Sequence, residues 1–87
     1  MILRETSKFS KLRKKIKSPA ERESLKAAVI AIQDNPLIGK KWKGEFEHLR
    51  SYPYQAGGQA RRIIYLFEPD QDAITLFSFG PRQSIYK

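Results

Sequence analysis

Three arginines and a tyrosine in the C-terminal half of the sequence have the types and spacing to act on a phosphate group. Arg50 and Arg62 lie in segments that are typical of β-strands, and Arg82 and Tyr86 follow the last such segment. If neighbouring strands bring their ends together, these four side chains converge on one face of a sheet. Arginine binds phosphate oxygens through two parallel hydrogen bonds and stays charged. The set therefore predicts a site that stabilises the negative charge developing on phosphorus when a phosphodiester is attacked.

RNA is the phosphodiester that such a site can cut with the fewest protein groups. Its 2′-hydroxyl attacks the neighbouring phosphate, so a protein needs only to align the reacting groups, assist proton transfer and neutralise charge. Tyr86 is a candidate proton carrier or a stacking platform for an unpaired base. His48 and Tyr52, close to Arg50 in the sequence, are further candidates. Arg61 is expected to be a surface residue whose stem spans apolar neighbours.

The composition excludes several other kinds of site. The chain has 87 residues, no cysteine and one histidine, which excludes disulfides and thiolate metal sites. No cluster of carboxylates has metal-ligand spacing, and there is no glycine-rich phosphate loop. We therefore expect a single domain over residues 1–87 with no metal and no cofactor. No apolar run reaches the roughly 20 residues of a membrane span, and the N-terminus lacks the charge order of a signal peptide, which indicates a cytoplasmic protein.

The positive charge lies in the first half of the chain. The formal net charge is +8 at pH 7; residues 1–43 hold 12 Lys or Arg and 4 acidic residues, whereas residues 44–87 hold 5 of each. Such a field attracts a polyanion or an acidic protein partner, although a solvated lysine-rich helix that only keeps the protein soluble has the same composition. The candidates for contact with RNA are Lys11, Lys14, Lys15, Lys41 and Lys43.

The hydrophobic pattern predicts an α+β fold with the element order β-α-α-β-β-β, in which a helical hairpin packs on one face of a small, mainly antiparallel sheet. From Ser7 onward, apolar residues recur at helical spacing, and Ser18 and Pro19 then start a second helix that runs to about Gln33. The remaining predicted elements are strands at 1–4, 45–52, 61–68 and 73–80, the last two joined as a hairpin, and a long mobile loop at 53–60.

The predicted core is formed by apolar residues of both layers. Helical spacing places three residues on the buried face of the second helix. Aromatic residues of the last two strands are expected to pack against them. These core residues are Leu25, Val29 and Ile32 in the helix and Tyr65, Phe67, Phe77 and Phe79 in the strands.

Four segments carry a family resemblance through their order along the chain. They are an opening strand followed by a lysine-rich helical hairpin, then "WKGEF", "RRIIYLF" and "FGPRQSIY". The last three are similar to an L-x-G segment, a Y-R-I-I-Y strand and a G-x-R-x-x-x-Y ending. In this order they resemble the RelE/ParE superfamily, the toxins of bacterial type II toxin-antitoxin modules. The resemblance covers essentially the whole chain.

The resemblance implies the compact α+β fold of that family and a toxin that a cognate antitoxin wraps in a hetero-oligomeric complex. In the RelE branch, the activity is cleavage of mRNA in the ribosomal A site. By position, Arg62 matches the arginine of the Y-R-I-I-Y strand, Arg82 that of G-x-R, and Tyr86 the final tyrosine. Arg50 falls near a lysine pair on the second strand of active members. Arg61 stands where the family usually has an aromatic residue.

The resemblance leaves three functions open. A ribosome-dependent endoribonuclease, with ribosome and mRNA as partners, is favoured by Arg62, Arg82 and Tyr86. The ParE branch shares the fold but poisons DNA gyrase, so a gyrase inhibitor is an alternative. The third possibility is a catalytically silent protein that only binds an antitoxin.

Overall fold

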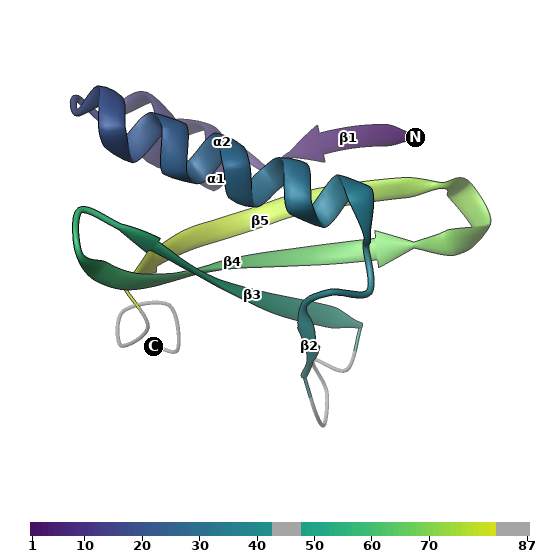
Figure 1. Cartoon of the computed structure of the whole chain (residues 1–87). Helices are drawn as coiled ribbons and strands as arrows, with labels where there is room; N and C mark the ends of the chain where they lie inside the picture. The colour runs from purple at the N-terminus through teal and green to yellow at the C-terminus, as the bar shows by residue number, and fades with distance from the viewer. Residues whose placement is uncertain (43–47, 82–87) are drawn as a thin grey trace.

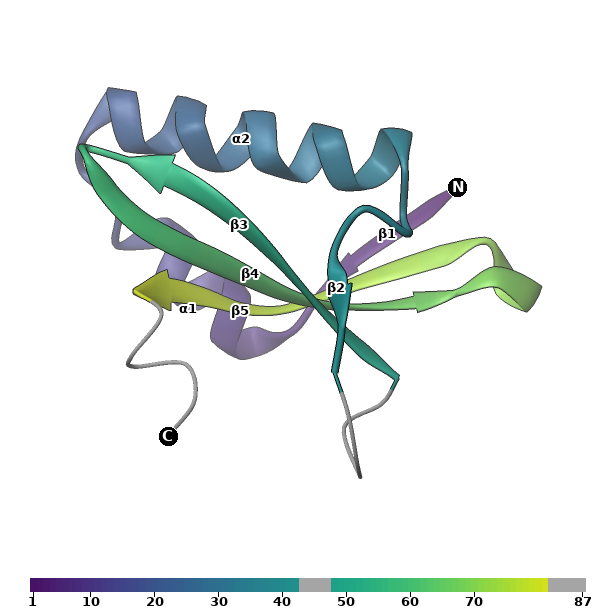
Figure 2. The same ribbon diagram turned by 60° about the horizontal axis from the view of Figure 1, so that its bottom comes forward.

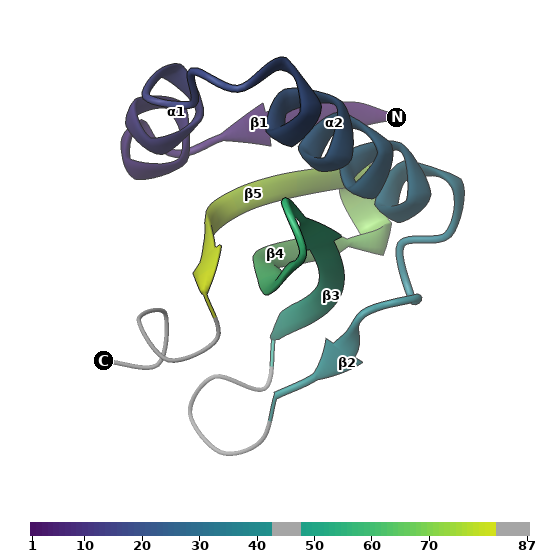
Figure 3. The ribbon, with the colours of Figure 1, turned by 60° about the vertical axis from the view of Figure 1, so that its left-hand side comes forward.

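The computed structural model describes residues 1–42 and 48–81, which form two helices packed on one face of a five-stranded mixed sheet (Figures 1 and 3). The strand order is β1-β5-β4-β3-β2; β1 runs parallel to β5, and the other neighbouring strands are antiparallel. The predicted α+β architecture is confirmed, with the short strand β2 as an addition. The elements are β1 (Ile2–Glu5), α1 (Ser7–Lys14), α2 (Pro19–Asp34), β2 (Lys40–Lys41), β3 (Leu49–Ala56), β4 (Gln59–Glu68), a 3-10 turn (Pro69–Gln71) and β5 (Ala73–Pro81).

Each helix begins at a side-chain cap. The hydroxyl of Ser18 accepts a hydrogen bond from the Glu21 backbone N–H at 3.4 Å, and Pro19 follows as the first residue of α2. Pro is favoured there because the first backbone N–H groups of a helix have no partner within it. The predicted start of this helix is therefore confirmed.

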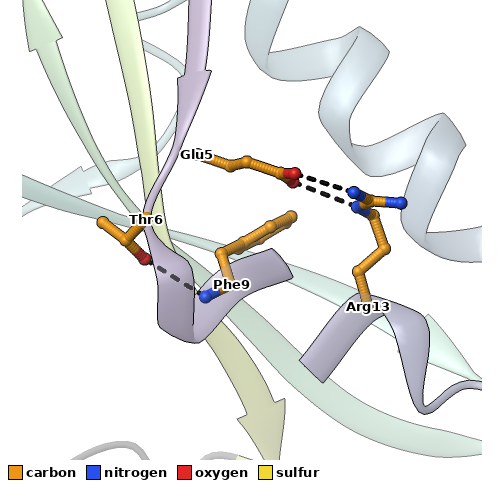
Figure 4. A network of polar contacts seen from close by, with 4 residues as sticks. All are labelled: Glu5, Thr6, Phe9 and Arg13. Atoms are coloured by element: carbon orange, nitrogen blue, oxygen red, sulfur yellow. Dashed lines mark hydrogen bonds and ion pairs between the residues drawn. The ribbon is translucent and has the colours of Figure 1, made fainter. Parts of the chain in front are cut away.

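Thr6 caps α1 and also joins this helix to the sheet. Its hydroxyl accepts a hydrogen bond from the Phe9 backbone N–H at 3.1 Å and donates one to the Phe77 carbonyl in β5 at 2.7 Å. Figure 4 shows this cap beside a second link between β1 and α1, in which Arg13 donates two hydrogen bonds to the Glu5 carboxylate at 2.7 and 3.0 Å. The Arg13 guanidinium holds the pKa of Glu5 below its usual value.

Thr6→Val is expected to lower the free energy of unfolding by about 1–2 kcal/mol, because it removes the cap and the bond to β5 while keeping the side-chain shape. For a domain of this size each 1 kcal/mol corresponds to a fall in Tm of about 4–8 °C. Thermal unfolding measures the effect. Thr6→Ser keeps the hydroxyl and serves as the control; equal Tm values for the two variants would contradict a role for these bonds.

The core lies between the two helices and the central strands. Phe9 of α1 packs edge-to-face on Phe79 of β5, with ring centroids 5.0 Å apart. The core cluster also contains Leu25, Ala28 and Ile32 of α2 and Ile63, Tyr65, Ile74 and Leu76 of the sheet. Val29 and Phe67 are partly buried against it. All the predicted core residues except Phe77 are thus in or against this cluster.

Phe77 was predicted to be buried, and that prediction is wrong. In the pairing of β4 with β5, Ile64 lies opposite Ser78 and Tyr65 lies opposite Leu76. Phe77 is therefore the extra residue of a β-bulge, which interrupts the alternation of faces along a strand. Phe77 is 36% exposed.

The predicted loop at 53–60 is also wrong, because this segment continues the sheet. β3 and β4 pair from Leu49 opposite Leu66 to Ala56 opposite Gln59. The two residues between them, Gly57 and Gly58, have φ angles of 59° and 77°, as a two-residue type I′ hairpin turn requires. Figure 2 shows this long twisted ribbon ending beside the N-terminal end of α2.

A proline inside a strand explains part of that error. Pro53 lies within β3 opposite Arg62. β2 pairs only with Arg50 and Ser51, so the rest of β3 is an edge strand, where a residue without a backbone N–H is tolerated. β3 spans 49–56, whereas 45–52 was predicted; residues 45–47 lie outside the described residues.

Candidate functional site

The alternation of side chains along the central hairpin separates two of the candidate arginines. Arg50 lies opposite Tyr65, a member of the core between sheet and helices. Arg62 bonds to Ser51, the next residue after Arg50 in β3, and therefore lies on the opposite side of the sheet. The prediction that Arg50 and Arg62 converge on one face is wrong. We call the sheet surface away from α1 and α2 the far face; it carries Ser51, Pro53, Arg62, Ile64 and Ser78.

Arg50 holds the segment between α2 and β2. Its Nη1 donates hydrogen bonds to the Gly39 carbonyl at 2.9 Å and to the Leu37 carbonyl at 3.4 Å. Beside it, the Tyr65 hydroxyl accepts a hydrogen bond from the Gly39 N–H at 3.0 Å and donates one to the Pro36 carbonyl at 2.7 Å. The guanidinium of Arg50 thus has a structural use on the helix side of the sheet.

Arg62 is half-buried on the far face, near the C-terminal end of β5. Its Nη1 donates a hydrogen bond to the Ser51 hydroxyl at 3.3 Å, and Ser51 is only 2% exposed. On its other side Arg62 lies opposite Gly80 of β5. Gly80 and Pro81 precede Arg82 in the sequence. Arg82 and Tyr86 themselves lie outside the described residues.

The lysines predicted to contact RNA belong to separate surfaces. Lys11 and Lys14 of α1, and Lys15 at its C-terminal end, are exposed. Lys41 is also exposed, but it lies in β2. α1 packs on β5, whereas β2 is the edge strand at the other end of the β5-β4-β3-β2 series. Lys43 lies outside the described residues.

His48 and Tyr52 do not join Arg62. His48 is exposed in a turn just before β3. Tyr52 lies opposite Ile63 and packs against the core on the helix side. The side chain that does lie beside Arg62, Ser51, was not singled out from the sequence. Its signal was weak: a small polar residue between Arg50 and Tyr52, facing the other way in a strand.

Arg61 has a role that the sequence did not indicate. Its side chain is 18% exposed and forms an ion pair with Glu21 of α2, with 3.7 Å between Nη2 and Oε1. Nη2 also donates a hydrogen bond to Gln59 Oε1 at 3.3 Å. The buried Nε has no hydrogen-bond partner among the described residues. Since Glu21 and Arg61 are 40 positions apart, no local sequence pattern reveals this pair.

Tyr54 of β3 lies opposite Arg61 and packs against the core on the helix side of the sheet. Burial raises the pKa of Tyr54 to about 12, an effect that Arg61 opposes and Glu21 reinforces. Burial also raises the pKa of Tyr65, while the hydrogen bond from Gly39 lowers it.

The raised pKa of Tyr54 predicts a loss of stability at alkaline pH. The folded protein holds the phenol proton more tightly than the unfolded chain, so this stabilisation is complete below the ordinary pKa of 10.0 and is lost as pH rises through about 12. Tyr54→Phe is therefore expected to have a shallower fall in the free energy of unfolding above pH 10. Urea unfolding at a series of pH values measures both slopes; parallel curves would contradict the prediction.

Residues 1–42 and 48–81 contain neither a metal-binding cluster nor a membrane-spanning helix. No group of three or more His, Cys, Asp or Glu side chains in these ranges is arranged to hold a metal ion. None of the helices in these ranges is long and apolar enough to cross a membrane.

Solved structures of bacterial toxins share this fold. The intact RelBE toxin-antitoxin complex of Escherichia coli matches with a TM-score of 0.73 at 16% identity, covering 92% of this chain and 94% of that chain. The isolated RelE toxin of E. coli matches with a TM-score of 0.74 at 19% identity, covering 98% and 89%. A RelBE complex of Mycobacterium tuberculosis matches with a TM-score of 0.71 at 16% identity, covering 93% and 96%. At these identities the likeness concerns the fold.

The sequence comparisons identify the family. No curated protein sequence matches the chain. A family profile described as the ParE-like toxin of type II bacterial toxin-antitoxin systems matches residues 3–87. The resemblance to the RelE/ParE superfamily is thereby confirmed, and the chain belongs to the ParE-like toxins of type II toxin-antitoxin systems.

Proposed function

We propose that this toxin is a ribosome-dependent mRNA endoribonuclease. The observation that carries the proposal is the setting of Arg62: a half-buried guanidinium on the far face, bonded to the buried Ser51 and opposite Gly80, which leads into Arg82. Partial burial strengthens the attraction between a guanidinium and a phosphate because fewer water molecules compete. The RelE toxins with the same fold support the same class of activity.

The proposed reaction uses the nucleophile of the RNA itself. The 2′-oxygen attacks phosphorus as the bond to the 5′-oxygen breaks, which gives a 2′,3′-cyclic phosphate and a 5′-hydroxyl end. Arg62, with Arg82, binds the non-bridging oxygens and stabilises the added negative charge. Tyr86 carries the proton between the 2′-oxygen and the leaving 5′-oxygen. Ser51 positions Arg62, and Arg50 contributes only through the fold.

A cognate antitoxin is the proposed regulator. The RelBE complexes of similar fold contain such a partner. In this chain the exposed lysines of α1 offer a surface for an acidic or amphipathic antitoxin segment. The toxin and its antitoxin would act in the cytoplasm, where ribosomes and mRNA are found.

Inhibition of DNA gyrase is the second candidate function. Two observations favour it. The matching family profile is that of ParE-like toxins, and the far face lacks Arg50, which bonds to the segment between α2 and β2 instead. A toxin of this kind would block supercoiling and leave mRNA intact.

One experiment separates these functions. The protein is induced in bacteria, mRNA 5′ ends are mapped by primer extension, and supercoiling by purified gyrase is assayed with the purified protein. We expect new 5′ ends at fixed codon positions and unchanged supercoiling. Lost supercoiling without new ends would replace the nuclease by the gyrase inhibitor, and no effect in either assay would indicate a silent antitoxin-binding protein.

A further inference from the structure

A second basic site lies at one end of the sheet, outside the far face. It is a pocket of about 520 Å³ between the α1–α2 connection, the first turn of α2, and the ends of β4 and β5. Its lining includes the cations Lys15, Lys17 and Arg61, the carboxylate of Glu21, and the backbone at Gly80. Three positive charges face one negative charge, so the pocket has a net attraction for an anion.

The bonding of Arg61 leaves capacity for such an anion. The hydrogen bond to Gln59 is long, at 3.3 Å, and the 3.7 Å separation from Glu21 is an ion pair beyond hydrogen-bond distance. Nε has no partner among the described residues, but it is buried, so an anion in the pocket would meet the outer nitrogens of the guanidinium. A buried guanidinium usually has its donors satisfied, because each unmet donor costs stability. Arg61 is therefore held in place without being fully paired.

The pocket adjoins the candidate catalytic residue through the backbone. Arg61 and Arg62 are consecutive and point to opposite faces of β4, and Gly80, which lines the pocket, is the partner of Arg62 in β5. β1 pairs with β5 only at residues 73–76, so β5 is the edge of the sheet near Gly80. A chain that carries an anion at each unit can cross this edge and place one anion on Arg62 and another in the pocket. RNA has this property at every nucleotide.

We propose that the pocket formed by Lys15, Lys17 and Arg61 binds a backbone phosphate of single-stranded RNA close to the nucleotide held at Arg62, an inference that rests on the RNA-directed function proposed above. Arg61 supplies the fixed part of the site, because Glu21 and Gln59 restrain its guanidinium. The exposed Lys15 and Lys17 supply mobile point charges. Glu21 weakens binding, because its carboxylate competes with the phosphate for Arg61.

The test uses the opposite effects of neighbouring substitutions. The probe is a short, labelled single-stranded RNA with 2′-O-methyl riboses, which has no free 2′-hydroxyl and stays intact. Its affinity for the free toxin is measured by fluorescence anisotropy at several salt concentrations. We expect Arg61→Gln to weaken binding about tenfold and to reduce the salt slope by about 0.7. Lys17→Ala should weaken binding about threefold, and Glu21→Gln should strengthen it about threefold.

Matched controls separate the effect of the pocket on RNA affinity from the effect of net charge. Lys26→Ala removes one exposed lysine of α2 outside this pocket, and Glu23→Gln removes one exposed carboxylate of the same helix. Each should change affinity less than the pocket variant of the same charge. Because Arg61 also contributes to folding, the Tm of each variant is measured as well. If Arg61→Gln does not fold, Lys17→Ala tests the phosphate site alone, because Lys17 is exposed and its loss should not affect folding.

The outcomes are distinct. Pocket variants that bind RNA no differently from their charge-matched controls would overturn the inference. So would variants that bind RNA normally but lose binding to a polyglutamate peptide, since the pocket would then suit a protein partner. Arg61-dependent RNA binding without mRNA cleavage by the wild type would uphold the phosphate site and reject the nuclease. Cleavage with unaffected RNA binding would reject the phosphate site alone.

Discussion

Arg62→Ala is expected to reduce mRNA cleavage on the ribosome by at least about 100-fold, the usual cost of losing a group that stabilises transition-state charge. The guanidinium lies half-buried on the far face, where its charge is only partly screened by water. Growth arrest on induction should disappear. Cleavage is measured by primer extension on ribosomes programmed with a defined mRNA.

Two controls separate a loss of catalysis from a loss of folding. The hydrogen bond from Arg62 to Ser51 is long, at 3.3 Å, and therefore weak. The Tm of Arg62→Ala should therefore lie within a few degrees of that of the wild type. Arg62→Lys keeps the charge without the planar fork and should retain intermediate activity. An Arg62→Ala protein that remains folded and fully toxic would remove Arg62 from the catalytic site.

Gly39→Ala is expected to lower the free energy of unfolding by about 2–4 kcal/mol, through overpacking and lost hydrogen bonds. A Cβ at this position would lie 2.6 Å from the Tyr65 hydroxyl oxygen and 2.7 Å from a ring carbon. Tyr65 is completely buried, so it cannot move aside without disturbing the packing of its neighbours. For a chain of this size, Tm should fall by more than about 10 °C.

Tyr65→Phe measures the hydrogen-bond part of this effect. It keeps the ring but leaves the Gly39 N–H and the Pro36 carbonyl without their partner, which should cost about 1–3 kcal/mol. Differential scanning calorimetry compares the two variants. If Gly39→Ala melts within about 2 °C of the wild type, the close packing of Gly39 on Tyr65 does not exist in solution.

Local patterns were enough to predict the helical layer and three of the strands, β1, β4 and β5. The spacing of apolar residues and the Ser18-Pro19 start define α2, and the long apolar segments of β4 and β5 identify them as strands. These features depend on neighbours in the sequence. The hairpin from β3 to β4 does not follow from these patterns, because Pro53 and the Gly57–Gly58 pair are typical of loops. Two adjacent glycines equally suit the tight turn that joins the two strands.

The composition of the site depended on register, which the sequence did not reveal. Arg62 was placed correctly in β4, but which face each side chain occupies depends on how separate strands align. Arg50 therefore belongs to the helix side with Tyr65, and the bulge at Phe77 turns one aromatic residue outward. The contacts of Arg62 with Ser51, and of Arg61 with Glu21, join different elements and became visible only in the fold.

The dependence of cleavage on a single ribose hydroxyl tests the nuclease proposal most directly. Ribosomes are programmed with two mRNAs that differ only in the nucleotide 5′ to the expected cut in the A-site codon, which carries ribose in one and 2′-deoxyribose in the other. The wild-type toxin should cut the ribose mRNA and leave the deoxyribose mRNA intact, and Arg62→Ala should leave both intact. Equal cutting of both mRNAs, or of neither, would contradict attack by the 2′-hydroxyl.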